Sequence, residues 1–326
     1  MSTKLRSIAR LVRLPNLLII AATQYAMRYL VMEPLLPSRN FELQFERVPF
    51  ALLVLATLFI AAAGYIINDY FDTRTDLINK PGKVVVGLRI RRRVAMLLHA
   101  ALNIIGVGIG VYLSFYVKLP SLSFVFVIAT GLLWFYSTHY KRQFLVGNLS
   151  VAFLTGLVPL MVVLFEIPLL NAAYGDVMLR YNANFNYMAA WVGGFSFFAF
   201  LTTLIREVVK DAEDFEGDNA YGMKTLPIVL GSGWTKAIVL FLVSVTLGML
   251  VYLLFRHIVF SVDPPDFLSL AYFVVFLILP LLLLSIQIIS AKDKKQYRRA
   301  SLLIKFIMLF GILYAGLVFV LVNYRY

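Results

Sequence analysis

The sequence predicts an all-α membrane protein, and three observations predict it. Hydrophobic residues make up 61% of the 326 residues, whereas soluble domains contain roughly 45–50%. The excess is gathered into runs long enough to cross a bilayer, which are separated by short charged stretches. These runs lack the short alternating segments of a transmembrane β-barrel. Because a lipid-exposed backbone must satisfy its own hydrogen bonds, each run is predicted to be a helix.

About nine spans are expected, in a single transmembrane domain that covers residues 1–326. They form two four-helix halves, about 1–140 and 141–290, and a ninth helix near 300–322, around a central cavity. The expected spans lie at 14–32, 48–67, 94–116, 121–138, 148–169, 187–205, 236–256, 267–290 and 300–322.

The distribution of charge predicts how the protein is oriented. The net charge is +13, and most of the 30 Lys and Arg lie at the N-terminus or after the second, fourth, sixth and eighth spans. The positive-inside rule places those segments in the cytoplasm and the C-terminus outside an inner or plasma membrane. Since a basic rim of this kind accounts for the charge, no nucleic-acid partner is predicted. The chain has no cysteine, which excludes disulfides, zinc–thiolate sites and cysteine nucleophiles.

An acidic cluster follows the second span. Asn68, Asp69, Asp72 and Asp76 come directly after a long apolar run. At about 100° per residue, all four lie on one side of a helix. Oxygen ligands of this type suit a hard divalent cation such as Mg²⁺.

A second acidic cluster follows the sixth span, with the same gaps of three and four residues. It consists of Asp211, Asp214 and Asp218. The even number of intervening spans places both clusters at the same membrane face. We expect each to begin as a helical extension that carries the aspartates, followed by a loop that folds over the site, with turns at Pro81-Gly82 and at Gly231-Ser232-Gly233.

Together the two clusters predict a diphosphate site. Mg²⁺ commonly takes one or two carboxylates and completes its shell with substrate phosphates. Cationic residues flank the clusters, namely Arg74, Lys80, Lys83, Arg206, Lys210 and Lys224. Because the site lies at the mouth of an apolar bundle, the expected ligand is a prenyl diphosphate, with Asp72, Asp76, Asp214 and Asp218 as the catalytic candidates.

The same residues leave two other functions open. A divalent-cation transporter would use the acidic clusters as an ion vestibule, and a lipid-binding scaffold would bind prenyl lipids without Mg²⁺. Elsewhere, Arg28 is interpreted as an interfacial residue, and Glu166 and Pro168 as marking the end of a helix. Glycines 106, 108 and 110 are expected to allow close helix packing.

Several stretches resemble the UbiA superfamily of intramembrane prenyltransferases, and the resemblance covers nearly the whole chain. Asn68-Asp69-x-x-Asp72-x-x-x-Asp76 resembles its first aspartate-rich motif, and Asp214-x-x-x-Asp218 resembles its second. Further similar stretches are Arg13 in Leu-Val-Arg-Leu-Pro-Asn, Tyr136-Ser137, Lys141-Arg142 with Gly147-Asn148, and Gly222-Met-Lys224-Thr225-Leu-Pro.

The resemblance implies nine helices around a cavity open to lipid, with Mg²⁺ holding the donor diphosphate. The implied metal ligands are Asn68, Asp69, Asp72, Asp76, Asp211, Asp214 and Asp218. The expected diphosphate contacts are Arg13, Asn68, Lys83, Lys141, Arg206, Lys210 and Lys224. Tyr136 and Asn148 are candidates for the substrate wall.

Within the superfamily, the stretches Asn79-Lys80-Pro81 and Lys83-Val-Val-Val-Gly87 are most similar to the geranylgeranylglycerol-phosphate geranylgeranyltransferase group. So is Lys210-Asp211-Ala-Glu-Asp-Phe-Glu-Gly217-Asp218. The implied donor is geranylgeranyl diphosphate and the implied acceptor is a prenylated glycerol phosphate. Members that prenylate aromatic acceptors for quinone synthesis have similar motifs, so an aromatic acceptor stays open.

Overall fold

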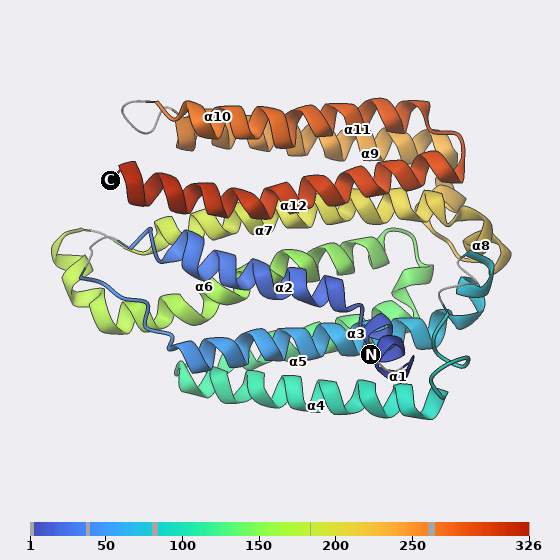
Figure 1. Ribbon diagram of the computed structural model, residues 1–326, viewed down its shortest axis with the longest axis horizontal. Helices are drawn as coiled ribbons and strands as arrows, with labels where there is room; N and C mark the ends of the chain where they lie inside the picture. Colours follow the sequence, from blue (N-terminus) through green and yellow to red (C-terminus); the bar gives the residue numbers. More distant parts are fainter. Residues whose placement is uncertain (1–2, 37–39, 80–83, 183, 260–264, 326) are drawn as a thin grey trace. The chain divides into compact units, whose positions relative to one another are not determined.

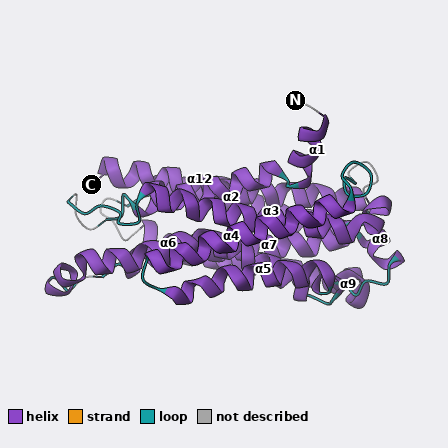
Figure 2. Ribbon diagram, turned by 90° about the horizontal axis from the view of Figure 1, so that it is seen from below, coloured by secondary structure: helices purple, strands orange, loops and turns teal. Residues whose placement is uncertain are grey.

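The computed structural model describes residues 3–36, 40–79, 84–182, 184–259 and 265–325. The described chain is helical and contains no strand, only an isolated bridge between Val86 and Ile90 (Figure 2). The α-helices are α1 (Thr3–Leu11), α2 (Leu14–Ala26), α3 (Arg47–Asn79), α4 (Arg92–Tyr116), α5 (Ser123–Thr138), α6 (Val146–Arg180), α7 (Asn186–Glu213), α8 (Phe215–Ala220), α9 (Leu226–Leu253), α10 (Phe267–Phe273), α11 (Leu279–Ser290) and α12 (Lys294–Arg325). Short π-helical turns extend α2 over Met27–Met32, α9 over Leu254–Val259 and α10 over Val274–Ile278.

Eight helices in the described residues are long and apolar enough to cross a membrane. The all-α polytopic fold is therefore confirmed. The first expected span, 14–32, is helical as α2 and its π-helical extension but is not one of these eight. Its apolar character is interrupted by Gln24 and Arg28, both of which are buried inside the protein.

The described residues form two compact units. The first contains Met1–Lys141 and Leu157–Gly194, and the second contains Arg142–Gly156 and Phe195–Tyr326. In the first, α3 packs against α2, α4 and α5, and in the second, α11 packs against α9 and α12 (Figure 1). The chain passes from the first unit to the second after Lys141, returns within α6 and crosses again within α7. The predicted single domain with two four-helix halves stays a prediction.

Helix α3 carries the first acidic motif beyond the apolar part of the span. Its 33 residues reach about 50 Å at 1.5 Å per residue, whereas the hydrocarbon layer is about 30 Å thick. The expected helical extension is confirmed here, because Asn68 to Asp76 continue the same helix.

The second acidic motif does not lie on one helix, contrary to the expectation of a single helical extension. Helix α7 ends at Glu213, Asp214 leaves helical geometry at φ −93° and ψ 8°, and α8 begins at Phe215. Only Asp211 is therefore on α7, while Asp218 lies on α8. Of the two expected turns, Gly231 has φ 77° and interrupts α9, whereas Pro81-Gly82 lies outside the described residues.

The interpretations of Glu166, Pro168 and Arg28 are wrong. Helix α6 continues past Pro168 to Arg180. Glu166 is completely buried and Arg28 is 3% exposed, and the two form an ion pair. The Glu166 Oε1 atom also accepts hydrogen bonds from the backbone N–H groups of Gln44, at 2.6 Å, and Phe45, at 2.9 Å. A buried charge requires such partners. The partners of Glu166 lie too far from it in the sequence for a local sequence pattern to identify them.

Two of the three glycines in α4 permit close packing, as expected. A Cβ atom at Gly110 would overlap the ring of Phe126 on α5, and one at Gly106 would lie 2.9 Å from the Ile60 side chain on α3. Nothing lies within 4 Å of such an atom at Gly108, so the expectation fails at that position.

Gly110→Ala is expected to destabilise the protein, and Gly108→Ala provides its matched control. Overpacking costs about 1–3 kcal/mol, and the gain in helix propensity returns up to about 1 kcal/mol. The free energy of unfolding should therefore fall by about 1–2 kcal/mol for Gly110→Ala and should not fall for Gly108→Ala. Denaturant titration in detergent measures both values, and equal effects would contradict the packing described above.

Candidate active site

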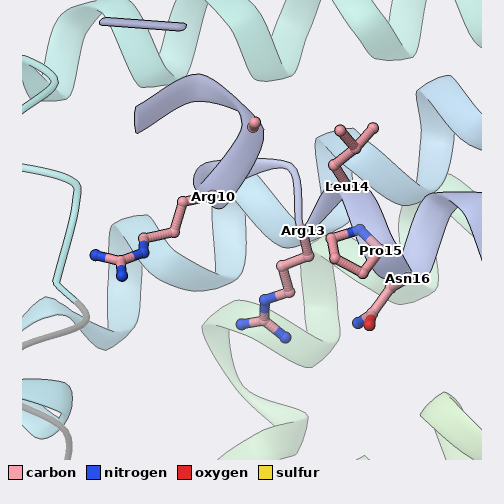
Figure 3. A pocket seen from close by; sticks show the side chains of 6 residues that line it. Arg10, Arg13, Leu14, Pro15 and Asn16 are labelled. Atoms are coloured by element: carbon pink, nitrogen blue, oxygen red, sulfur yellow. The ribbon is translucent and has the colours of Figure 1, made fainter. Parts of the chain in front are cut away.

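Arg13 neutralises the first aspartate of α3. It lies in the turn between α1 and α2 with φ 51°, and its Nη2 atom donates to Asp69 Oδ1 at 2.9 Å. Its guanidinium also lies 4.8 Å from the centre of the Tyr65 ring. Burial works against the charged form of Arg13, but Asp69, Tyr65 and Tyr136 together outweigh it and raise the pKa of the guanidinium. Arg13 also lines a shallow surface pocket with Arg10 and Asn16 (Figure 3).

Lys141 neutralises the second aspartate of α3. It lies in a short 3₁₀ turn after α5 and forms an ion pair with Asp72, which is 5% exposed. Burial again opposes the charge, yet Asp72, Tyr136 and Asp76 together raise the pKa of the Lys141 ammonium. The structure therefore brings two predicted cations, two predicted carboxylates and Tyr136 into one cluster at the end of α3.

The segment after α3 packs back onto this end of the first unit. Val85 and Val86 are buried with Leu11 of α1 and Ile66 of α3 in one apolar cluster. The loop is thus held beside the Arg13–Asp69 pair. Lys83 lies just outside the described residues, so its predicted contact with phosphate stays a prediction.

The second unit holds its own acidic cluster. Asn148 Nδ2 donates to Asp211 Oδ2 at 2.8 Å, and Asp214 and Asp218 are both buried. The chain turns back after α8 because the Met223 N–H donates to the Asp218 carbonyl at 3.0 Å. Lys224 follows with an exposed side chain, and its backbone N–H donates to the Arg142 carbonyl at 2.9 Å.

Glu207 is a carboxylate that the sequence reasoning missed. Its side chain is 8% exposed, and each of its oxygens has a cation beside it. Arg206 Nη1 lies 2.6 Å from Oε1, and Lys210 Nζ lies 3.7 Å from Oε2. Glu207 precedes Asp211 by one turn on the same face of α7, so its spacing from Asp211 could have revealed it.

The donor set fits Mg²⁺ by its chemistry. Carboxylate and amide oxygens are the ligands that Mg²⁺ prefers, and the Asn68 side-chain oxygen is buried without a hydrogen-bond partner in the described structure. Among the described residues, no group of three or more acidic or His side chains is arranged so that it could hold a metal ion. Asp69 and Asp72 are instead held by Arg13 and Lys141. The convergence of the two motifs on one metal site stays a prediction.

Long apolar helices that carry clusters of paired carboxylates and cations at their ends define a polytopic membrane protein. The family is established by comparison. The chain belongs to the UbiA prenyltransferase family, whose model matches residues 41–310. It is therefore an integral membrane prenyltransferase.

Known relatives agree in sequence and in fold. A digeranylgeranylglyceryl phosphate synthase of Methanobrevibacter smithii is 31% identical over 260 residues, which are 80% of this chain and 85% of that protein. A structure from work on digeranylgeranylglyceryl phosphate synthase in membranes matches with a TM-score of 0.63 at 20% identity, over 97% of this chain and 99% of that one. A UbiA homologue of Archaeoglobus fulgidus, bound to GPP and Mg²⁺, matches with a TM-score of 0.55 at 14% identity, over 95% and 99% of the two chains.

Proposed function

We propose that the protein transfers a geranylgeranyl group from geranylgeranyl diphosphate to a hydroxyl of geranylgeranylglyceryl phosphate, in a reaction that depends on Mg²⁺. The observation that carries the proposal is the pairing of aspartates with cations at the end of α3. The half-buried Asp69 pairs with Arg13, and the buried Asp72 pairs with Lys141. The name of the M. smithii relative supports the acceptor. The A. fulgidus homologue, solved with a prenyl diphosphate and Mg²⁺, supports the donor class and the metal.

The proposed metal ligands are the two acidic motifs, with Asp72, Asp76, Asp214 and Asp218 as the catalytic carboxylates. The full proposed set is Asn68, Asp69, Asp72, Asp76, Asp211, Asp214 and Asp218. When bound, Mg²⁺ supplies positive charge that shields the diphosphate and favours its departure.

The cationic residues hold the donor diphosphate in this proposal. They are Arg13, Lys83, Lys141, Arg206, Lys210 and Lys224. The bond from C1 of the donor to the diphosphate oxygen breaks, and the oxygen keeps the electron pair. Positive charge fixed beside that oxygen stabilises the negative charge as it develops. The acceptor hydroxyl oxygen then bonds to C1, and its proton passes to a carboxylate of the second acidic motif.

Tyr136 and Asn148 are proposed to border the substrate. Tyr136 is in electrostatic range of Arg13 and Lys141, and Asn148 holds Asp211. The positive-inside rule further supports an active site and N-terminus on the cytoplasmic side, with the C-terminus outside.

An assay with purified protein tests the function. With labelled geranylgeranyl diphosphate, geranylgeranylglyceryl phosphate and Mg²⁺, the expected product is digeranylgeranylglyceryl phosphate, detected by mass spectrometry. Chelation with EDTA should lower turnover at least about a hundredfold, since removal of one charge-stabilising element costs about that much, and added Mg²⁺ should restore it. Turnover that persists in EDTA contradicts the metal assignment. Product formed only with an aromatic hydroxybenzoate contradicts the lipid acceptor.

A further inference from the structure

Glu207 has no part in the proposed reaction, yet it holds two of the cations assigned to the diphosphate. Arg206 and Lys210 flank it on α7, and each cation faces a different oxygen of its carboxylate, at 2.6 Å and 3.7 Å. The carboxylate is nearly enclosed, whereas the side chains of the two cations are 24% and 28% exposed. The buried partner is thus the anion, and the cations are the more accessible groups.

The surroundings of Glu207 allow a diphosphate to replace it as the partner of Arg206 and Lys210. Asp211 lies within electrostatic range of both Glu207 and Lys210, so the cations also reduce the repulsion between two acidic side chains. A diphosphate carries more negative charge than one carboxylate, and it is the stronger partner for two adjacent cations. The same two groups can therefore bind Glu207 or a diphosphate.

We propose that Glu207 is a positioning residue that occupies Arg206 and Lys210 while the donor is absent and yields them to its diphosphate. The inference rests on the proposed function for the assignment of Arg206 and Lys210. The diphosphate must compete with the Glu207 carboxylate for these two cations.

If Glu207 competes with the diphosphate for Arg206 and Lys210, removing its charge should tighten the binding of pyrophosphate. Removal of the Glu207 charge takes away both a rival for the cations and a source of repulsion for the incoming anion. Glu207→Gln should therefore bind inorganic pyrophosphate more tightly, with Kd lowered about tenfold, which corresponds to about 1.4 kcal/mol. Loss of a purely structural contact would leave the affinity unchanged or weaken it.

Calorimetric titration of the full-length protein with inorganic pyrophosphate tests the inference, once in Mg²⁺ and once in EDTA. The matched control is Glu216→Gln, since Glu216 is an exposed carboxylate on α8 and should leave Kd within twofold of the unmodified protein. The inference requires tighter binding by Glu207→Gln in both buffers. Unchanged or weaker binding in both buffers overturns it, and weaker binding confined to Mg²⁺ overturns it by making Glu207 a metal ligand.

A second variant keeps the test decisive if Glu207→Gln does not fold. In Glu207→Asp the shorter carboxylate cannot serve both cations, so Kd should fall about threefold, and an unchanged Kd overturns the inference. Pyrophosphate binding needs no acceptor and no turnover. If the unmodified protein binds pyrophosphate but does not prenylate geranylgeranylglyceryl phosphate, the proposed function fails while the Glu207 variants still decide this question.

Discussion

Asp72→Asn is expected to lower prenyl transfer at least about a hundredfold while the protein stays folded. Asp72 is buried and lies beside Lys141, so the substitution removes a proposed metal ligand and the counter-ion of a proposed diphosphate contact together. Loss of one such charge-stabilising group typically costs about 10²–10³ in turnover. The asparagine keeps the shape of the side chain, which limits the effect on packing.

The measurement is turnover of geranylgeranyl diphosphate at saturating acceptor, together with the thermal unfolding midpoint of each variant. Asp176→Asn is the control, because Asp176 is exposed near the end of α6 and should retain turnover within about twofold. If Asp72→Asn keeps full turnover, Asp72 is not a catalytic carboxylate and the site must be reassigned.

Arg28→Met is expected to cause the largest loss of stability. Glu166 would lose its counter-ion in a fully buried position and keep the N–H groups of Gln44 and Phe45 as partners. Removal of one member of a buried ion pair costs about 3–5 kcal/mol. Denaturant titration should show a loss of that size, whereas the exposed Arg180 should tolerate the same substitution within about 0.5 kcal/mol.

The double variant Arg28→Met with Glu166→Gln sharpens this prediction. It leaves no uncompensated charge, so its loss of stability should be smaller than the sum of the two single losses by at least about 1 kcal/mol. Strict additivity would show that the two side chains do not stabilise each other.

The sequence predicted those features that depend on local patterns. Long apolar runs predicted the helices, and the one-sided spacing of Asn68 to Asp76 predicted the helical extension of α3, because helix periodicity determines both. The spacing at Asp211 to Asp218 was the same, yet the chain breaks at Asp214 and forms α8. Residue spacing does not determine where a helix ends, since the fold around the loop also contributes.

Features that depend on distant partners could not be predicted. Arg28 and Glu166 are 138 residues apart in the sequence, and each looks like a helix-end residue when its local sequence is considered alone. The pairing of Arg13 with Asp69 and of Lys141 with Asp72 is of the same kind. The family resemblance implied phosphate contacts for Arg13 and Lys141, but only the fold shows that both cations already have carboxylate partners.

The length of α3 has a consequence for how a lipid-soluble donor would be handled. Helix α3 is longer than the hydrocarbon layer is thick, so its carboxylates are expected to lie outside that layer. A headgroup docked there can keep much of its water while its isoprenoid chain remains dissolved among the acyl tails. A donor bound in this way would not have to leave the bilayer as a whole molecule.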